Sequence, residues 1–438
     1  MKADVIVIGG GLAGLAAALR LGQAGKRVVV LESRQRLGGR AGSFVDAVTG
    51  QMIDACQHVS MGCCLALAEF CRDAGIHEYL EPQRALYFMS PDGRVSPFKA
   101  DPWPAPFHLG RALLGAHYLT ATEKIRIVYG MACLVLADAD DDPPLLPWLL
   151  KHKQTRRTID RFWGVVLTSA LNETVDRVGR KYARKVFVDG FLKTRDGFTV
   201  EVPTVPLGKL YGEELSNALT RSGATIRENA GVRRIHIEAD RVTHLELRDG
   251  TRLEAETYLV AVPFDRLADL LPPEIAAREP FSFAAKLQPS PITSVHLWYD
   301  RPLTSLPHVV FVDCLGQWLF NRGETAPGEH YAQVVVSAAR PLKGIGKDET
   351  QARIAAELRT LFPKTAAAKL LRAKVVTEHT ATFSAVPDVD AFRPGPRTPI
   401  GNLILAGDWT ATGWPATMEG AVRSGNAAAA AVLLENSS

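Results

Sequence analysis

The sequence has no run of about 18 or more uncharged apolar residues, and this excludes a transmembrane helix of ordinary length. It has only six cysteines in 438 residues and no Cys-x-x-Cys pair, so we expect a reducing compartment, no disulfide scaffold and no metal site. The chain runs from Met1 directly into a strand-like segment, which leaves no room for a signal peptide. Nucleic-acid-binding motifs are missing too. We therefore expect a cytoplasmic protein that does not bind nucleic acid.

Neither sign of charge is in large excess. The formal net charge is +4, and the 47% hydrophobic and 22% charged residues are typical of globular proteins. A chain of this length favours two domains over one core. Local basic runs at residues 151–161 and 181–185 could meet acidic lipid head groups, although a solvated face is their more common role. Peripheral contact with the inner face of the cytoplasmic membrane stays open as an alternative.

The strongest pattern lies in residues 4–40, which follow the order strand, glycine turn, helix and second strand of a dinucleotide-binding βαβ unit. Gly9 is predicted to make the tight turn, Gly11 to let the backbone approach a pyrophosphate, and Gly14 to let helix and strand pack closely. The helix N-terminus offers free N–H groups to the pyrophosphate, and Glu32 is placed to accept from a ribose hydroxyl. The residues predicted to contact this part of the cofactor are Gly9, Gly11, Leu12, Ala13, Gly14, Glu32, Ser33 and Arg34.

A second glycine-rich segment follows at Arg36-Leu37-Gly38-Gly39-Arg40. Its glycines let a loop pass close to the cofactor, and Arg40 could pair with a phosphate through two parallel hydrogen bonds. Together with Glu32 the segment resembles the signature of the FAD-dependent amine oxidase and phytoene desaturase superfamily. The resemblance favours FAD over NAD and adds Gly39, Arg40 and Ala41 to the expected cofactor contacts.

The end of the chain repeats the physical pattern of the beginning. A buried strand at residues 402–406 ends in Gly407 and Asp408, and a helix of small residues runs to Leu434. A helix N-terminus at the flavin ring would stabilise negative charge on its reduced form. We expect Gly407, Asp408, Ala416, Thr417 and Met418 to contact FAD, with Asp408 at the ribityl or phosphate region. The resemblance further implies that Val232 meets the adenine through its backbone.

These patterns predict an α/β, two-domain FAD-dependent oxidoreductase. Residues 1–84, 205–265 and 395–438 are assigned to a discontinuous Rossmann-like FAD domain. Residues 85–204 and 266–394 are assigned to a substrate domain of mixed sheet and helices, with a helical, potentially membrane-facing region at 105–200.

Three segments, at residues 36–41, 54–59 and 413–425, look like those of the hydroxysqualene dehydroxylase family. The resemblance implies reductive removal of the hydroxyl group from hydroxysqualene, a hydrophobic isoprenoid, to give squalene. It also places Gln57 and His58 beside the flavin. The sequence departs from the expected pattern at Ala55 and Cys56, where the family is expected to carry Asn-Gly, so a flexible glycine is missing from this loop.

Such a reaction needs an acid, because an allylic alcohol ionises with acid assistance before it takes up a hydride. His58 is the first candidate and Glu419 the second. His58 as a structural hydrogen-bonding group, and Glu419 as an acidic residue in a first helical turn, are the alternatives. Trp298, Tyr299, Trp318, Phe320 and Trp414 could line the cavity or pack in a core. A carotenoid or squalene desaturase, an amine oxidase and a non-enzymatic FAD-binding protein stay open, and nothing in the sequence indicates the electron donor.

Overall fold

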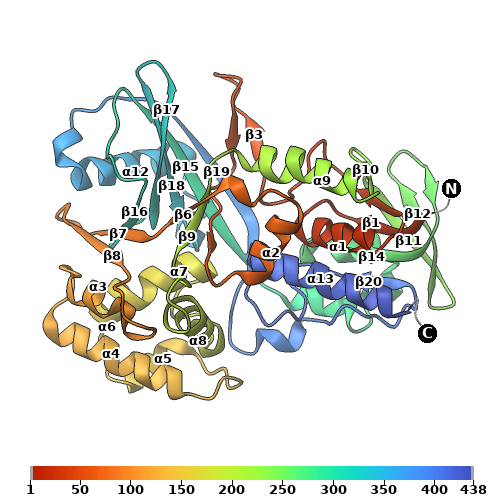
Figure 1. Ribbon diagram of the computed structural model, residues 1–438, viewed down its shortest axis with the longest axis horizontal. Helices are drawn as coiled ribbons and strands as arrows, with labels where there is room; N and C mark the ends of the chain where they lie inside the picture. Colours follow the sequence, from red (N-terminus) through yellow and green to blue (C-terminus); the bar gives the residue numbers. More distant parts are fainter. Residues whose placement is uncertain (1–2, 436–438) are drawn as a thin grey trace.

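The computed structural model describes residues 3–435, which form two parts that the chain crosses between repeatedly (Figure 1). One part is built on a parallel sheet and contains both the first and the last helix. The other combines a mixed sheet with a group of short helices, drawn in orange and yellow in Figure 1. This is the predicted α/β fold with two sheet-based parts.

The parallel sheet has five strands in the order β10-β2-β1-β14-β20. Its members are β10 (Thr225–Arg227), β2 (Val28–Leu31), β1 (Ala3–Ile8), β14 (Ala255–Val260) and β20 (Leu403–Leu405). All pairings are parallel, so the carboxyl ends of strands from three distant stretches of the chain meet at one edge. Both faces are covered, which explains why these strands are continuous apolar runs.

Helices α1 (Leu12–Gln23) and α13 (Met418–Glu435) lie side by side against this sheet (Figure 1). The two helices approach closely because their contact is made of alanine and glycine. A Cβ atom at Gly425 would lie 2.2 Å from the carbonyl oxygen of Ala13, so no larger residue fits there. The first and last helices thus form one packed unit, together with α9 (Leu215–Arg221).

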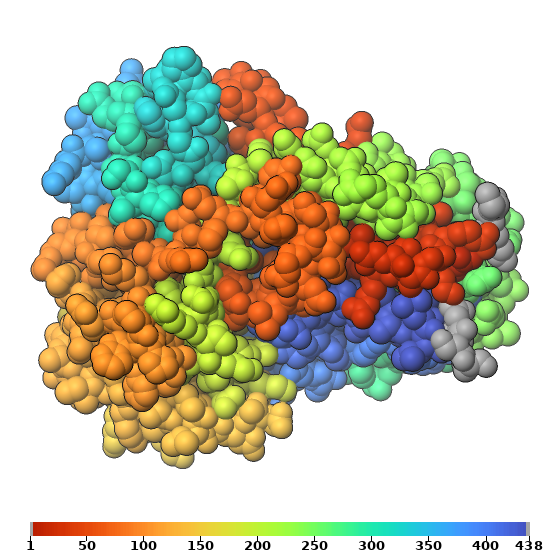
Figure 2. All heavy atoms as spheres, in the orientation of Figure 1, coloured from red at the N-terminus to blue at the C-terminus, as the bar shows by residue number. Residues whose placement is uncertain are grey.

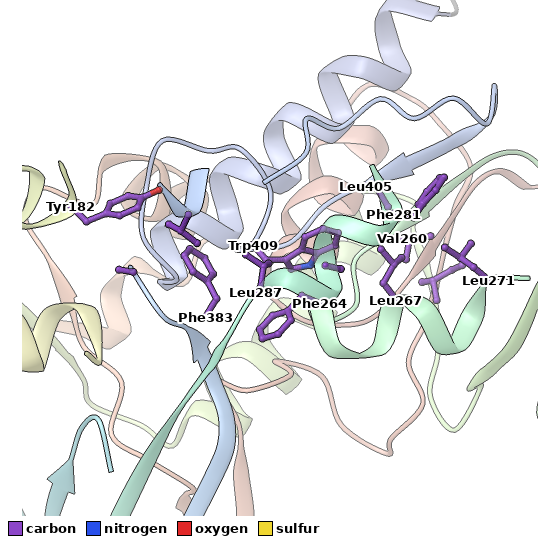
Figure 3. Close-up of a cluster of buried hydrophobic side chains, with 14 of the residues drawn as sticks. Tyr182, Val260, Phe264, Leu267, Leu271, Phe281, Leu287, Phe383, Leu405 and Trp409 are labelled. Atoms are coloured by element: carbon purple, nitrogen blue, oxygen red, sulfur yellow. The ribbon is translucent and has the colours of Figure 1, made fainter. Parts of the chain in front are cut away.

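On the opposite face of the sheet, aromatic and aliphatic side chains form a second core. Figure 3 shows it running from Tyr182 through Phe383 and Trp409 to Phe264 and Leu271. Phe264 begins helix α10 (Phe264–Leu270), and Leu271 directly follows it. Phe383 is the last residue of a strand of the other sheet. This core therefore fixes the position of the mixed sheet relative to the parallel sheet.

The mixed sheet has seven strands in the order β19-β15-β18-β17-β16-β7-β8. They are β19 (Leu370–Phe383), β15 (Pro289–Tyr299), β18 (Glu329–Val336), β17 (Trp318–Ala326), β16 (His308–Phe311), β7 (Ala85–Met89) and β8 (Val95–Lys99). All pairings are antiparallel except β16 with β7. Residues Val295, Leu297 and Tyr299 of β15 belong to the core beneath α12 (Lys347–Leu361), so His296 and Trp298 point to the other face.

The helical region differs from expectation. The sequence predicts two long helical stretches, residues 109–136 and 145–171, but several shorter helices form. They are α3 (Gly110–Leu114), α4 (Ala121–Leu136), α5 (Leu145–Lys151), α6 (Arg156–Thr158), a π-helical turn (Ile159–Trp163), α7 (Gly164–Leu171) and α8 (Arg180–Phe187). Local caps contribute to the breaks: Thr120 and Glu123 form a capping box that starts α4, and the Thr155 side chain accepts from Thr158 N at the start of α6.

Smaller elements complete the fold. There are two further short sheets. One pairs β3 (Ser43–Val45) with β4 (Met52–Asp54). The other has the order β5 (Ser60–Met61), β9 (Val200–Pro203) and β6 (Leu80–Gln83). A meander of β11 (Val232–Glu238), β12 (Arg241–Leu247) and β13 (Arg252–Leu253) follows β10, and α2 (Leu65–Asp73) and α11 (Pro273–Ala276) lie in connections.

Candidate functional site

The glycine turn between β1 and α1 has the geometry expected of a pyrophosphate cradle. Gly9 has φ +112°, and a Cβ there would lie 2.6 Å from the Ala261 carbonyl oxygen. A Cβ at Gly14 would lie 2.1 Å from the Gly9 carbonyl oxygen, so glycine is needed for helix and turn to touch. Gly11, the N-cap of α1, faces open space instead. Its backbone is accessible at the positive end of the helix dipole, as an anion would require.

Glu32 is buried directly after β2, within reach of the glycine turn. One carboxylate oxygen accepts from Gly10 N at 2.9 Å, and the other accepts from Ser33 Oγ at 3.1 Å and Arg34 N at 2.8 Å. These bonds fix the carboxylate orientation, and Oε2, which accepts only from Gly10 N, retains acceptor capacity for a ribose hydroxyl. Ala230 N donates to the Glu32 carbonyl at 2.8 Å, which brings the neighbouring Val232 to the same edge of the sheet.

The loop of residues 36–42 closes over the glycine turn. Gly38 N donates to Gly10 O at 2.9 Å, and a Cβ at Gly39 would lie 3.1 Å from the Gly11 Cα. Arg40 does not extend two free parallel N–H groups, because its guanidinium donates to Asp408 Oδ1 at 2.5 Å and to Ala381 O at 2.8 Å. In this structure Asp408 is therefore the ion-pair partner of Arg40.

The ends of the chain meet through this ion pair. Gly407 N donates to Ser424 Oγ at 2.8 Å, which anchors the strand end to α13. Thr417 caps the first turn of α13 by accepting from Gly420 N at 3.1 Å, and Met418 Sδ accepts from the hydroxyl of Tyr211 at 3.8 Å. Helix α13 begins at Met418 and not at Trp414, so residues Ala416 to Met418 form the N-terminal turn that the sequence predicts near the flavin.

Two observations indicate that this edge fits FAD. Gly11 leaves an open approach at a helix N-terminus, and Arg36 Nη1 is buried without a hydrogen-bond partner. Arg36 packs so closely under the loop that a Cβ at Gly42 would lie 1.9 Å from Nη1. A diphosphate supplies the acceptors that these groups lack. Arg36 is a candidate contact that the sequence prediction omitted, although it lies within the recognised signature.

Gln57 and His58 lie in the loop between β4 and β5. The His58 Nδ1 lies 3.0 Å from the Cys56 carbonyl oxygen and donates to it, and Gln57 Nε2 donates to the His58 carbonyl. Burial lowers the pKa of His58, and the charge of Arg40 lowers it further. In this arrangement the Nδ1 proton is engaged by the Cys56 carbonyl and is not directed at a substrate. The structure thus favours the hydrogen-bonding role for His58.

The Ala55-Cys56 departure leaves the loop intact. Neither residue belongs to the described residues with positive φ, so the backbone here takes conformations that any residue adopts. Burial raises the pKa of the Cys56 thiol to about 12, which makes it a small apolar side chain and not a nucleophile.

Glu419 has a structural role that the sequence did not indicate. It is 1% exposed, and its carboxylate accepts from Ala66 N at 3.1 Å, Leu67 N at 2.7 Å and Arg423 Nε at 2.6 Å. Glu419 therefore caps the N-terminus of α2 from α13. The structure therefore favours this capping role for Glu419 over the predicted role as an acid.

The aromatic residues predicted to form one cavity wall lie in different places. Trp298 stacks on Tyr331 with ring centroids 4.8 Å apart, and Arg372 lies 3.5 Å from its centroid. Tyr299 points to the opposite face of the sheet and packs near α12. Lys185 and Arg423 lie over Trp414 at 4.5 and 4.9 Å. Trp318 and Phe320, stacked 5.4 Å apart on the same sheet face as Trp298, remain as wall candidates.

Between the β3–β4 hairpin and the mixed sheet lies a cavity of about 130 Å³, which the sequence did not predict. The residues that line it include Asp54, Arg322, Tyr331 and Gln333. Burial raises the pKa of Asp54, against smaller lowering effects from Ser43, Leu207 N and Arg322. Asp54 belonged to the recognised segment but carried no predicted role, because its burial and the strands that face it come from distant parts of the chain.

The structure joins a parallel nucleotide sheet, with its glycine turn, acidic strand end and overlying glycine loop, to a mixed sheet that has a cavity beside the β3–β4 hairpin. These features define an FAD-dependent oxidoreductase of the two-domain type. The sequence pattern described as flavin containing amine oxidoreductase matches residues 12–433. The chain belongs to this family, and its cofactor is FAD.

Relatives within the family differ in their reactions. The chain is 29% identical over 450 residues to the hydroxysqualene dehydroxylase of Sinorhizobium fredii, which covers 99% of each chain. It is 27% identical over 453 residues to the 15-cis-phytoene desaturase of an Oncidium hybrid cultivar, which covers 98% of this chain and 78% of the relative. Among solved structures, an oxidoreductase from Methanosarcina mazei superposes with a TM-score of 0.75 at 18% identity. Cyclohexylamine oxidase from Brevibacterium oxydans superposes with a TM-score of 0.70 at 20% identity. Each superposition covers 100% of both chains. The two structures show the shared fold.

Proposed function

We propose that the protein catalyses the FAD-dependent reductive dehydroxylation of hydroxysqualene to squalene. The observation that carries the proposal is the 29% identity to a hydroxysqualene dehydroxylase over the full length of both chains. In this reaction the hydroxyl group leaves as water and the allylic carbon takes up a hydride. Reduced FAD supplies a hydride when it is bound. The protein's own residues bind the isoprenoid, exclude water and deliver the proton.

The charges around the cavity support a neutral substrate. Arg322 lines the cavity, whereas Arg372, which lies over Trp298, is ion-paired with Asp46 and Glu329. An ammonium group in the cavity would meet the like charge of Arg322, which disfavours an amine oxidase. An alcohol or a hydrocarbon carries no charge for Arg322 to repel.

Desaturation of a carotenoid or of squalene is a second candidate, favoured by several phytoene desaturases with 25–27% identity over 98–99% of this chain. It would use the same fold in the oxidative direction. The electron partner differs between the two candidates, since dehydroxylation needs a reductant and desaturation an electron acceptor.

The test is a single turnover in D2O. The purified holoenzyme is photoreduced without oxygen and mixed with hydroxysqualene, and the products are analysed by mass spectrometry. We expect squalene with one deuterium on the carbon that lost its hydroxyl group, because the hydrogen on the reduced flavin exchanges with solvent. Two parallel incubations use oxidised enzyme. One contains a quinone with phytoene or squalene and tests for a desaturase. The other contains oxygen with putrescine or cyclohexylamine and tests for an amine oxidase. A polyene, or peroxide from an amine, with no squalene in the first reaction would reject dehydroxylation.

We also propose that the isoprenoid enters from a membrane surface. Among residues 3–435 no helix is both long enough and apolar enough to span a bilayer. Helix α4 nevertheless turns apolar side chains outward: Ile125 is 70%, Val128 58% and Leu136 86% exposed. Figure 2 shows this part of the chain, in gold, on one outer lobe. Exposed Lys151 and Lys153 follow nearby in the chain, as binding to anionic lipid would favour.

A further inference from the structure

Two polar atoms of the residues that line the 130 Å³ cavity have no hydrogen-bond partner: Asp54 Oδ2 and Gln333 Oε1. Asp54 is 4% and Gln333 1% exposed. An unpaired polar atom at such burial costs on the order of 1–3 kcal/mol. Groups of this kind that face a cavity are paired by a ligand or by water that enters it.

The remaining atoms of both side chains are held in place. Asp54 Oδ1 accepts from Ser43 Oγ and from Leu207 N, both at 2.7 Å. Gln333 Nε2 donates to Ser294 Oγ at 2.7 Å, which fixes the amide so that its oxygen stays an acceptor. The nitrogen also lies 3.4 Å from the Asp54 carbonyl oxygen, so the two residues are direct neighbours. The carboxyl and the amide are thus preorganised from both sheets.

We propose that this cavity binds the hydroxyl group of an alcohol substrate, and that Asp54 in its protonated form is the catalytic acid that donates a proton to that hydroxyl. The inference rests on the proposed dehydroxylation. A hydroxyl group accepts one hydrogen bond from Oδ2–H of Asp54 and donates one to Oε1 of Gln333. It therefore pairs both free atoms at once. The direction in which burial shifts the pKa of Asp54 favours the protonated carboxyl.

Other ligand classes fit less well. Arg322 Nη2 lies 4.0 Å from Asp54 Oδ2, and its charge would repel an ammonium group. An anion would be attracted to Arg322 but would place acceptor atoms against the Gln333 oxygen, leaving that oxygen unpaired. A hydrocarbon would leave both polar atoms unpaired. A neutral alcohol is the class that meets all three groups.

The acid step balances without an additional reactant. The proton passes from Asp54 Oδ2 to the hydroxyl oxygen, the C–O bond breaks with its electron pair on the oxygen, and water leaves. The allylic carbon is left with a positive charge for the hydride of the proposed function. Asp54 is left as a carboxylate 4.0 Å from the Arg322 cation, which stabilises the charge that develops during the step.

The experiment compares Asp54→Asn with the wild-type holoenzyme. Asparagine keeps an oxygen for Ser43 and Leu207 N but has no transferable proton. We expect the single-turnover rate with hydroxysqualene to fall by about 100-fold or more, with the FAD content and the flavin absorbance spectrum unchanged. The matched control is Asp142→Asn, because burial also raises the pKa of Asp142 and backbone N–H groups hold its carboxylate, but it does not line the cavity. This control should keep the wild-type rate.

Two readouts do not depend on turnover. Infrared spectra at neutral pH should show a protonated carboxyl band in the wild type that is missing in Asp54→Asn. In oxidised enzyme, intrinsic fluorescence titration should show tighter binding of hydroxysqualene than of squalene, and Gln333→Leu should reduce this preference by about tenfold, or 1.4 kcal/mol.

The outcomes separate the two proposals. A wild type that binds the alcohol preferentially and shows the carboxyl band, but forms no squalene, rejects dehydroxylation while the hydroxyl-binding site stands. A wild type that forms squalene while Asp54→Asn keeps its full rate overturns the acid assignment. So does a result in which His58→Ala stops turnover and Asp54→Asn does not. Equal affinity for alcohol and hydrocarbon overturns the hydroxyl-binding site.

Discussion

Burial shifts the pKa values of two histidines on the mixed sheet and of Asp54 on the neighbouring β3–β4 hairpin in opposite directions, and each shift favours the neutral form. It raises the pKa of Asp54 and lowers that of His296 and His308 to about 4. His308 is the simplest case, since it is 1% exposed, lies between the rings of Tyr87 and Trp318, and has neither ring nitrogen paired. Neutral side chains here suit a substrate that carries no charge.

This shift at His308 predicts acid sensitivity. Its pKa in the folded protein is lower than in the unfolded chain, so between about pH 6.5 and 4 only the unfolded chain takes up the proton. The contribution to stability is present above the unfolded pKa and is lost as the pH falls towards 4, by up to about 3 kcal/mol.

Urea unfolding at pH 7 and near pH 4.5 measures the effect. His308→Phe keeps an aromatic ring between the same neighbours and should make the free energy of unfolding less dependent on pH. His117→Phe, at an exposed histidine, should not change the pH dependence. An equal acid loss in wild type and His308→Phe would contradict the prediction.

Site residues that lie close together in the sequence could be predicted, whereas those brought together from distant segments could not. Gly9, Gly11, Gly14 and Glu32 lie in one βαβ unit, so their spacing alone indicates a nucleotide edge. Asp54 gains its burial from Leu207 and from strands that begin hundreds of residues later, and a single sequence does not show such pairings.

At the scale of elements, the two helices that the sequence treats separately depend on each other. Glu419 of α13 receives the first N–H groups of α2, and in return α2 covers the start of α13. Glutamate is common in the first turn of a helix because the dipole of that helix stabilises its charge. The sequence therefore showed no sign that Glu419 contacts a different helix. Strand β19 was missed for a similar reason, because polar residues interrupt its apolar pattern and its partners β15 and Arg40 lie far away in the chain.

Removing this cap should destabilise the protein without removing a catalytic group. Glu419→Ala leaves two backbone N–H groups of α2 and the Arg423 guanidinium without their acceptor, and we expect a loss of about 3 kcal/mol in the free energy of unfolding. Glu69→Ala, at an exposed position of α2, should change it by less than about 0.5 kcal/mol. Denaturant titration of the holoenzyme measures both. A stable Glu419→Ala protein that binds FAD normally but has lost turnover would restore Glu419 as a catalytic candidate.

At the scale of the whole molecule, exposed apolar side chains gather on α4 and on the segments before and after it. Nine of the exposed large apolar side chains lie between residues 103 and 150: Trp103, Phe107, Leu114, Ile125, Val128, Tyr129, Val135, Leu136 and Leu150. The sequence predicted an apolar helix here, but burial against the core was the more common alternative. In the structure Ile127 and Leu134 fill the core and Met131 packs against it, while Ile125, Val128, Tyr129, Val135 and Leu136 are left outside.

We therefore predict that the protein binds anionic vesicles through α4. Sedimentation with phosphatidylglycerol vesicles should show binding at low salt that weakens at about 0.5 M salt, because the attraction of the basic residues is screened. Ile125→Glu with Leu136→Glu should weaken binding by about tenfold or more. Val48→Glu with Leu371→Glu makes the same change of charge at exposed apolar residues elsewhere and should have little effect. Equal loss in both double variants would reject α4 as the membrane-binding face.

The contact between α1 and α13 also has a consequence for synthesis. Helix α1 is translated well before β20 and α13, which complete its sheet and cover its alanine face. Until β20 and α13 are made, the nascent chain carries an exposed apolar helix and, once β14 has been made, an unpaired edge of that strand. The Arg40–Asp408 pair at the phosphate cradle can form only after both residues have left the ribosome. The nucleotide edge is thus completed late, and chaperones that shield apolar segments have the translation of the intervening residues in which to act.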